Sequence, residues 1–208
     1  KVRILDGGMG QELLERGLKT EGTLWSASAL IEKKYHKLIT DTHIDFVKSG
    51  AEVIVTTTFS ARRIKLRENN VEHKFDQLNF IAAQLASKVK LKYPKILVAG
   101  GLPPQHLVYE ADLRPDKEIK QNFYDQAKII NSFVDFFYLE VISSVKEIKL
   151  AIEALKSFNK PYLIGLHISE GTKLPSGEKI SDVVKKVNHD NLLGIMLSCV
   201  SPENYELN

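Results

Sequence analysis

The sequence contains one cysteine, Cys199, and little of what marks secreted, membrane-spanning or metal-binding proteins. A single cysteine excludes an internal disulfide. No CxxC, HExxH or similar ligand spacing surrounds it, so the chain carries only part of a metal site. Its apolar runs are far shorter than the roughly 20 residues of a membrane-spanning helix. No segment resembles a signal peptide, and these absences make a cytoplasmic protein without a membrane span the expectation.

The chain also lacks any block of basic residues. Its formal net charge is +3, from 29 Lys and Arg against 26 Asp and Glu, and the lysines are spread along the sequence. No basic patch with interleaved aromatic residues is present, which argues against nucleic-acid binding. The 208 residues, 43% hydrophobic and 26% charged, are enough for one globular domain with a sizeable core.

Two glycine-based signatures are missing as well. The segment Asp6-Gly7-Gly8-Met9-Gly10 follows an apolar run, but Leu13 stands where a dinucleotide fingerprint requires its third glycine. No GxSxG motif or phosphate-binding loop occurs either. The paired glycines let a ligand approach the backbone closely, or they form a plain strand-to-helix turn in which Asp6 caps residues 9–11.

What the chain does have is an alternation of apolar, strand-like segments with helical patterns. Strands are expected at 2–5, 52–55, 96–99, 136–139, 162–166 and 193–197. Helices are expected from Ser26 or Ser28 to Val47, over 75–89 and 116–132, from Ser143 or Ser144 to Ser157, and over 181–187. The longest loops fall at 102–115 and 171–178. This order fits either a doubly wound sheet or most of an eight-stranded barrel.

Nearly every expected strand stops at a residue suited to chemistry. The stops are Asp6-Gly7-Gly8, Thr56-Thr57-Thr58, Gly100-Gly101, Glu140, His167 and Ser198-Cys199. In a parallel α/β protein the carboxyl ends of the strands share one face, and that face carries the active site. The six stops are therefore expected to belong to one site.

Several of these residues have competing interpretations. Glu140 ends an apolar strand, so its charge needs a partner: a structural Arg or Lys, or the ammonium of an amino-acid substrate. Cys199 is either a metal ligand or, as is more usual for a lone cysteine at a strand end, a small buried apolar residue. His36 and His43 lie seven residues apart on one expected helix and are interpreted as surface or packing residues.

The chain resembles the homocysteine S-methyltransferases in six motifs that follow the order of that family. They are LDGGMGQEL (5–13), VIVTTTFSA (53–61), VAGG (98–101), DFFYLEVI (135–142), GTKLPSGE (171–178) and GIMLSCVSP (194–202). The resemblance implies an α/β fold, the (β/α)8 TIM barrel, with strands one to six in this chain. Residues 1–208 would then form a single barrel domain that is incomplete at its C-terminal end. It also implies Zn²⁺ held by three cysteines, of which Cys199 matches one and the other two lie in a later Gly-Gly-Cys-Cys block.

The same resemblance assigns residues to a homocysteine pocket. Glu140 matches the glutamate that binds the substrate ammonium, and Asp6, Gly7 and Gly8 match the first-strand part of the pocket. Thr57 and Ser198 are assigned to this pocket too. Ser198 stands where the family usually has asparagine, and its side chain is shorter.

The methyl donor is assigned to a pocket formed by Trp25 and Phe59. Betaine enzymes cage a quaternary ammonium with aromatic rings, but Ser60 and Val141 stand where those enzymes tend to place tyrosines. The run Glu140-Val141-Ile142 resembles the Glu-Thr-Ile of S-methylmethionine-type members. An S-methylmethionine-like donor is therefore favoured over betaine.

The function that the resemblance implies is zinc-dependent methyl transfer from a sulfonium or ammonium donor to the thiolate of L-homocysteine, giving methionine. The expected partners are these small molecules, and neither nucleic acid nor a membrane is expected. The formation of a homo-oligomer is left open. One alternative is a metal-free lyase or hydrolase on the same barrel, using Asp6, Glu140 and His167. Another is a non-catalytic relative that binds an amino acid or a thioether.

Overall fold

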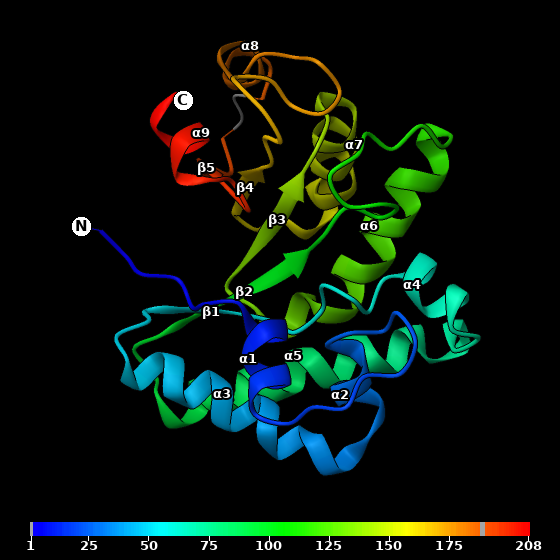
Figure 1. Ribbon diagram of the computed structural model, residues 1–208, viewed down its shortest axis with the longest axis vertical. Helices are drawn as coiled ribbons and strands as arrows, with labels where there is room; N and C mark the ends of the chain where they lie inside the picture. The colour runs from blue at the N-terminus through cyan, green and yellow to red at the C-terminus, as the bar shows by residue number, and fades with distance from the viewer. Residues whose placement is uncertain (1, 188–189) are drawn as a thin grey trace. The chain divides into compact units, whose positions relative to one another are not determined.

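The computed structural model describes residues 2–187 and 190–208 (Figure 1). The chain divides into two compact units. The first unit comprises Lys1–Gly101 and Ile129–Asp135, and the second comprises Leu102–Lys128 and Phe136–Asn208. Each unit contains parallel strands with helices between them, as the alternating sequence pattern predicts.

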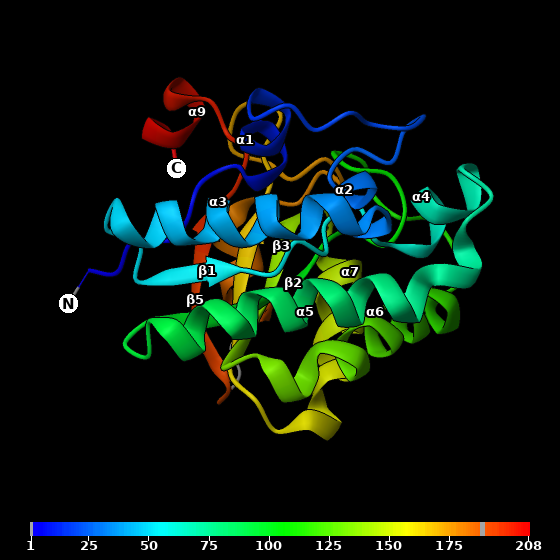
Figure 2. The ribbon, with the colours of Figure 1, turned by 90° about the horizontal axis from the view of Figure 1, so that it is seen from below.

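The first unit is built mainly of helices around a short parallel strand pair. Its helices are α1 (Met9–Glu15), α2 (Ala27–Ile31), α3 (His36–Lys48), α4 (Arg63–Glu68) and α5 (Phe75–Lys92), with 3-10 turns at Lys33–Tyr35, Glu72–Lys74 and Asn131–Phe133. Strand β1 (Val53–Val55) pairs in parallel with β2 (Leu97–Leu102), with Val53 opposite Leu97. Helix α3 packs on β1 and on α5 (Figure 2).

The core of this unit follows the apolar stripes of the sequence. The stripe expected over 75–89 forms α5, whose buried side chains include Phe75, Leu78, Leu85 and Val89. The helix expected from residue 26 or 28 to 47 is instead two helices, because Glu32 adopts an extended backbone between α2 and α3. Helix α4 is an element that the sequence pattern did not reveal.

The first expected strand, 2–5, is wrong as a strand. It makes only one bridge, Leu5 to Val53, in which the Ile4 carbonyl accepts from the N–H groups of Glu52 (2.8 Å) and Val53 (3.2 Å). Val2 and Ile4 are 88% and 59% exposed, so little apolar burial holds this segment against the sheet.

The second unit contains three strands in parallel order β3-β4-β5. Its elements are α6 (Asp116–Ile130), β3 (Phe136–Ile142), α7 (Val145–Leu155), a 3-10 turn at Lys156–Phe158, β4 (Tyr162–Leu166), α8 (Ile180–Lys186), β5 (Leu192–Leu197) and α9 (Pro202–Glu206). Strands β3 and β4 are almost wholly buried, as expected when both faces of a parallel sheet are covered. Helix α7 begins where the sequence predicts, because the Ser144 hydroxyl accepts from the Glu147 N–H (3.2 Å).

Strand β3 runs past its expected end at Leu139 and contains a bulge. Leu139 pairs with Ile164 and Ile142 pairs with Leu166, so Glu140 and Val141 together face Gly165 alone. Val141 has φ 56°, a left-handed conformation that is rare for a β-branched residue. Glu140 therefore lies inside a strand at a bulge, a feature that redirects side chains next to active sites.

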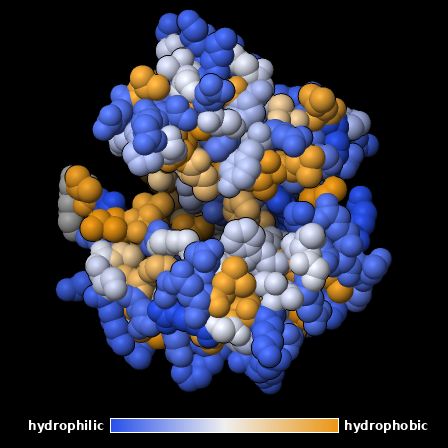
Figure 3. All heavy atoms as spheres, in the orientation of Figure 1, coloured by the Kyte–Doolittle hydropathy of each residue, from blue (hydrophilic) through white to orange (hydrophobic). Residues whose placement is uncertain are grey.

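The five strands and their helices confirm the parallel α/β class. Closure into an eight-stranded barrel and the single domain over 1–208 stay predictions. No helix in the described part of the chain combines the length and apolar character needed to cross a membrane. The face drawn in Figure 3 is largely hydrophilic, with separate apolar patches.

Candidate functional site

In the first unit, the Asp6 carboxylate accepts a hydrogen bond from the last residue of strand β1. Its Oδ2 accepts from the Val55 N–H (2.9 Å), while the Asp6 N–H donates to the Val53 carbonyl (2.9 Å). Helix α1 has Gly8 as its N-cap residue and no side-chain cap. The interpretation of Asp6 as a helix cap is therefore wrong, since its carboxylate joins the end of β1 to the chain before α1.

His43 connects Asp6 to Thr57. Its Nδ1 lies 3.7 Å from Asp6 Oδ2, and its Nε2 lies 3.4 Å from Thr57 Oγ1. His43 is fully buried, and Thr57 is buried beside it. Two residues expected in the substrate pocket are thus joined by a histidine that sequence reasoning treated as a surface or packing residue. Its position four residues after the buried Ile39 on the same helix was the available signal.

Two glycines of the first motif are required by close packing. A Cβ on Gly7 would lie 2.9 Å from Phe46 Cε1, and a Cβ on Gly10 would overlap the indole nitrogen of Trp25. Gly8 has no such neighbour, because its nearest atom is Gln11 Cβ at 3.9 Å. The motif therefore brings the Trp25 ring against the start of α1.

The two donor-pocket candidates differ in what surrounds them. Trp25 is 49% exposed and has φ 47°. Phe59 carries the guanidinium of Arg62 over its ring, 5.4 Å from the centroid. A cation already occupies the neighbourhood of the Phe59 ring, so Trp25 is the better placed of the two to receive a cationic donor.

In the second unit, the Glu140 side chain is half-buried at the bulge of β3, and its Oε1 is shielded from solvent. Cys199 lies two residues beyond the end of β5, with an exposed thiol and φ 54°. The interpretation of Cys199 as a small buried apolar residue is therefore wrong. The structure places a carboxylate within β3 and an accessible thiol just after β5 of the same parallel sheet.

Ser198, directly after β5, contacts residues of both β4 and β3. Its N–H donates to the Leu166 carbonyl (2.8 Å), and its Oγ shares a hydrogen bond with the Tyr138 hydroxyl (2.7 Å). Gly165 makes room for this pair, because a Cβ there would overlap Ser198 Oγ and lie 2.7 Å from the Tyr138 hydroxyl. The Ser198 hydroxyl thus already has a partner inside the protein.

His167 and Tyr109 surround the Cys199 turn. His167 Nδ1 lies 3.3 Å from the Ser198 carbonyl oxygen, and Nε2 lies 2.9 Å from Ser169 Oγ. The Tyr109 ring packs on His167 with centroids 4.4 Å apart. Burial lowers the pKa of His167, while its backbone contacts at Ser198 and Cys199 act in the opposite direction. Burial raises the pKa of Tyr109, and the charge and hydrogen bond of Cys199 add to the effect.

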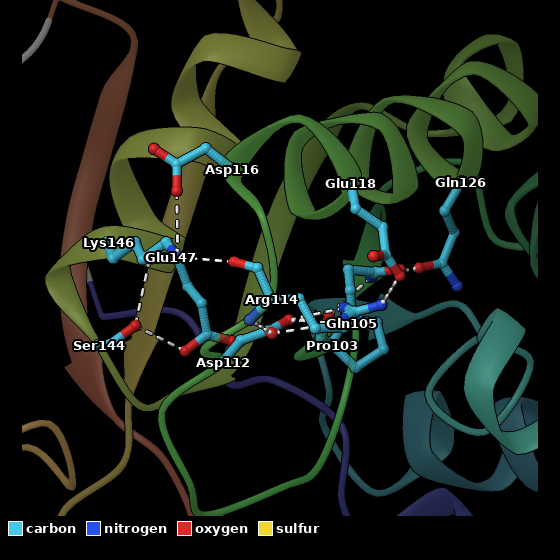
Figure 4. Close-up of polar contacts among 10 residues, drawn as sticks. All are labelled: Pro103, Gln105, Asp112, Arg114, Asp116, Glu118, Gln126, Ser144, Lys146 and Glu147. Carbon is cyan, nitrogen blue, oxygen red and sulfur yellow. Dashed lines mark hydrogen bonds and ion pairs between the residues drawn. The ribbon is translucent and has the colours of Figure 1, made fainter.

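Tyr109 was not identified from the sequence, although it lies in the loop 102–115, the longest irregular stretch noted there. Beyond Tyr109 this loop is anchored by charged side chains, of which Asp112 is buried (Figure 4). Arg114 Nη2 lies 2.6 Å from Asp112 Oδ2, and the Lys146 ammonium donates to the Arg114 carbonyl (2.7 Å). The Ser144 hydroxyl donates to Glu147 Oε2 (2.7 Å).

Burial raises the pKa of Glu147 to about 7. The Ser144 hydrogen bond and Arg114 act against this rise, and the nearby Asp112 charge adds to it. The loop is therefore held at helix α7 by a cluster that contains one largely desolvated carboxyl group.

The residues present do not by themselves fit a zinc site. Cys199 is the sole thiol of the sequence. Across residues 2–187 and 190–208, no three His, Cys, Asp or Glu side chains come together as metal ligands would. Zinc takes three or four protein ligands, so Cys199 alone among the described residues does not make a site.

Comparisons with known proteins agree with these features. A family model described as homocysteine S-methyltransferase matches residues 3–207. A homocysteine S-methyltransferase of Saccharomyces cerevisiae is 26% identical, with the match covering 97% of this chain and 70% of that protein. An S-methylmethionine-homocysteine S-methyltransferase of Pongo abelii is 33% identical, with coverage of 81% and 44%. The chain thus spans less than half of this second relative.

Solved structures give a similar result for the fold. The homocysteine methyltransferase MmuM from Escherichia coli, in its metallated form, superposes with a TM-score of 0.88 and 22% identity. The match covers 98% of this chain and 76% of that one. Its apo form superposes with a TM-score of 0.74. At this identity the likeness concerns the fold alone.

Proposed function

This chain belongs to the homocysteine S-methyltransferase family, and we propose that the protein transfers a methyl group to the sulfur of homocysteine, giving methionine. The observation that carries the proposal is the family match over residues 3–207. The second unit supports it, because a carboxylate at the β3 bulge and an exposed thiol after β5 suit an amino acid with a reactive sulfur. A cytoplasmic location and a homo-oligomer stay predictions.

We assign the substrate ammonium to Glu140. A half-buried carboxylate is stabilised by a cationic partner, and an amino-acid ammonium supplies both the charge and three N–H donors. From the family resemblance we also assign to substrate binding Asp6, Gly7, Gly8 and Thr57 of the first unit and Ser198 of the second. Of these, Asp6 and Thr57 are connected through His43, and Ser198 through Tyr138, so their orientations are set by the protein before substrate arrives.

We also propose Cys199 as one ligand of a zinc ion. The described residues do not complete such a site, so further ligands would have to come from outside them. Two cysteines are what the family resemblance implies. The part played by this chain's own residues is to hold the amino acid and to present the Cys199 thiol.

For the donor we favour a sulfonium of the S-methylmethionine type over betaine. Ser60 and Val141, which stand where betaine enzymes tend to have tyrosines, are both buried and provide no aromatic face. Trp25 keeps an exposed ring, whereas the Arg62 guanidinium lies over Phe59 and would repel a second cation there. One aromatic face suits a compact sulfonium better than it suits a caged quaternary ammonium.

The test is methyl transfer by the full-length protein with homocysteine and either S-methylmethionine or betaine, alongside metal analysis. We expect methionine to form faster with S-methylmethionine and one zinc to bind per chain. In Cys199→Ala we expect both the zinc and the activity to be lost. Methionine formed by zinc-free protein would overturn the metal assignment. Homocysteine binding without turnover by any donor would favour a non-catalytic relative.

A second test addresses Glu140. Glu140→Gln keeps the size of the side chain but removes its charge, and a hydrogen bond to a charged group contributes roughly 1.5–3 kcal/mol. We expect the Kd for homocysteine, measured by titration calorimetry, to rise about 10- to 100-fold. Glu153→Gln is the control, since Glu153 pairs with Lys120 on an exposed helix surface. An unchanged Kd in Glu140→Gln would remove Glu140 from the ammonium site.

A further inference from the structure

We propose that His167 is a positioning residue for Cys199, acting through the Ser198 carbonyl. Tyr109 flanks the same thiol. The inference rests on the proposed function only in giving Cys199 a role in the reaction. The contacts themselves lie within the second unit and involve residues from β4, β5 and the loop 102–115.

The Cys199 turn is one that has to be held in place. Its φ of 54° is left-handed, a conformation that is unfavourable for an L-residue other than glycine. Such conformations persist only where the surrounding structure enforces them. The residue before it supplies that constraint. The Ser198 N–H, hydroxyl and carbonyl are bonded to Leu166, Tyr138 and His167 respectively.

The His167 contact fixes the tautomer of the ring. A carbonyl oxygen only accepts, so His167 Nδ1 must carry the proton and donate to Ser198. In the neutral ring Nε2 is then an acceptor for the Ser169 hydroxyl. Both nitrogens are therefore engaged with protein atoms. His167 can therefore hold the peptide group before Cys199 in place. It has no free ring nitrogen for the acid-base role that the metal-free alternative requires.

Tyr109 bounds the thiol from the loop side. Its backbone is also left-handed, with φ 70°, and its ring lies on His167. Besides burial, the Cys199 side chain contributes to the raised pKa of the Tyr109 hydroxyl. Three residues later the loop is fixed by the Asp112–Arg114 pair, which the Lys146 contact ties to the start of α7. The Tyr109 ring therefore belongs to a loop that is fixed close by through the Asp112–Arg114 ion pair.

The experiment compares His167→Ala with His167→Asn in the full-length protein. The asparagine amide can place an N–H near the position of Nδ1, so it retains the donor to Ser198. Hydrogen exchange followed by mass spectrometry reports on the Ser198 N–H, which donates to Leu166 in the intact turn. Site-resolved alkylation by iodoacetamide in metal-free protein reports on the Cys199 thiol.

In His167→Ala we expect exchange at Ser198 to be about tenfold faster, and the alkylation rate of Cys199 to change at least about threefold. His167→Asn should stay within about twofold of the parent in both measurements. Equal rates in His167→Ala and the parent would overturn the proposal. So would His167→Asn behaving like His167→Ala, because ring packing rather than the donor would then hold the turn.

Two further variants secure the result. His36→Ala removes another histidine whose Nε2 contacts a backbone carbonyl, that of Leu30 (2.9 Å), and should leave Cys199 unchanged. If His167→Ala fails to fold, Tyr109→Ala serves instead. Tyr109 is a half-exposed loop residue whose removal should uncover Cys199 and speed its alkylation, and no change there would count against the proposal. Neither hydrogen exchange nor alkylation depends on methyl transfer. If both rates change as expected but the protein transfers no methyl group, the proposed function alone is contradicted.

Discussion

Left-handed backbone conformations at residues other than glycine occur at six described positions, and their distribution is informative. Asn70 and Asn159 follow helical segments, where asparagine tolerates this conformation. The other four are Trp25, Tyr109, Val141 and Cys199. Each is a candidate site residue or adjoins one, and none is an asparagine or aspartate, whose side chains ease left-handed geometry. Strain concentrated in this way is typical of functional sites, which agrees with the assignment of Cys199 and Glu140.

Single residues also show the limit of the sequence interpretation. Glu140, Cys199 and His167 were identifiable because they follow apolar runs, a local pattern. His43 and Tyr109 were not, since their importance comes from contacts with residues distant in the chain. His43 meets Asp6 37 positions earlier in the chain, and Tyr109 meets His167 58 positions later.

At the scale of elements, strands β3, β4 and β5 meet in one polar layer inside an otherwise apolar sheet. Tyr138, Gly165 and Ser198 come from or directly follow these three strands, and the glycine provides the space that the two hydroxyls share. The layer explains why a small residue is needed in the middle of the buried strand β4.

Gly165→Ala should therefore destabilise the protein. The new methyl group would displace Ser198 Oγ and the Tyr138 hydroxyl, and overpacking a buried site costs typically about 1–3 kcal/mol. Urea denaturation measures this loss of unfolding free energy. Gly194→Ala on β5 is the matched control, because a Cβ there meets only Leu163 Cδ1 at 3.7 Å. Equal stabilities of the two variants would show that the layer has room to adjust.

Elements were predicted well where the pattern is local. The helices expected over 75–89 and from residue 143 or 144 onward are confirmed as α5 and α7, because each carries an apolar stripe and the second has a serine cap. The strand at 2–5 failed because pairing and burial, rather than apolar composition, decide whether a segment forms a strand. The break at Glu32 was equally invisible, since the apolar spacing continues through it.

At the scale of the whole molecule, the stability of the fold should depend on pH through Glu147. Its folded-state pKa of about 7 lies above the ordinary value of 4.5. Between these values the folded protein holds a proton that the unfolded chain releases, so stability decreases as pH rises through this window. The free energy of unfolding stops decreasing once the pH exceeds the folded-state pKa of Glu147. The total decrease is up to about 3 kcal/mol.

Glu147→Gln should abolish this part of the pH dependence. The amide can still accept from Ser144 and never ionises, so its stability should change little between pH 5 and pH 8 where that of the parent falls. Urea denaturation at several pH values measures the difference. In Glu153→Gln the fall should persist, since Lys120 lowers the pKa of Glu153 and that group titrates below this window. A parent protein equally stable at pH 5 and pH 8 would contradict the role of Glu147.

The bulge in β3 has a consequence for how relatives of this chain are compared. Side chains on a strand alternate with a period of two, yet Leu139 and Ile142, three positions apart, pair with Ile164 and Leu166, which are two apart. The phase of the strand is therefore inverted after Glu140. An alignment that assumes unbroken alternation would assign Leu139 and Ile142 to opposite faces of the sheet. A relative with one residue fewer at 140–141 would have regular alternation through this strand. It would then lack the bulge in which the Glu140 carboxylate lies. Insertions and deletions at these two positions thus carry more functional meaning than substitutions along the rest of the strand.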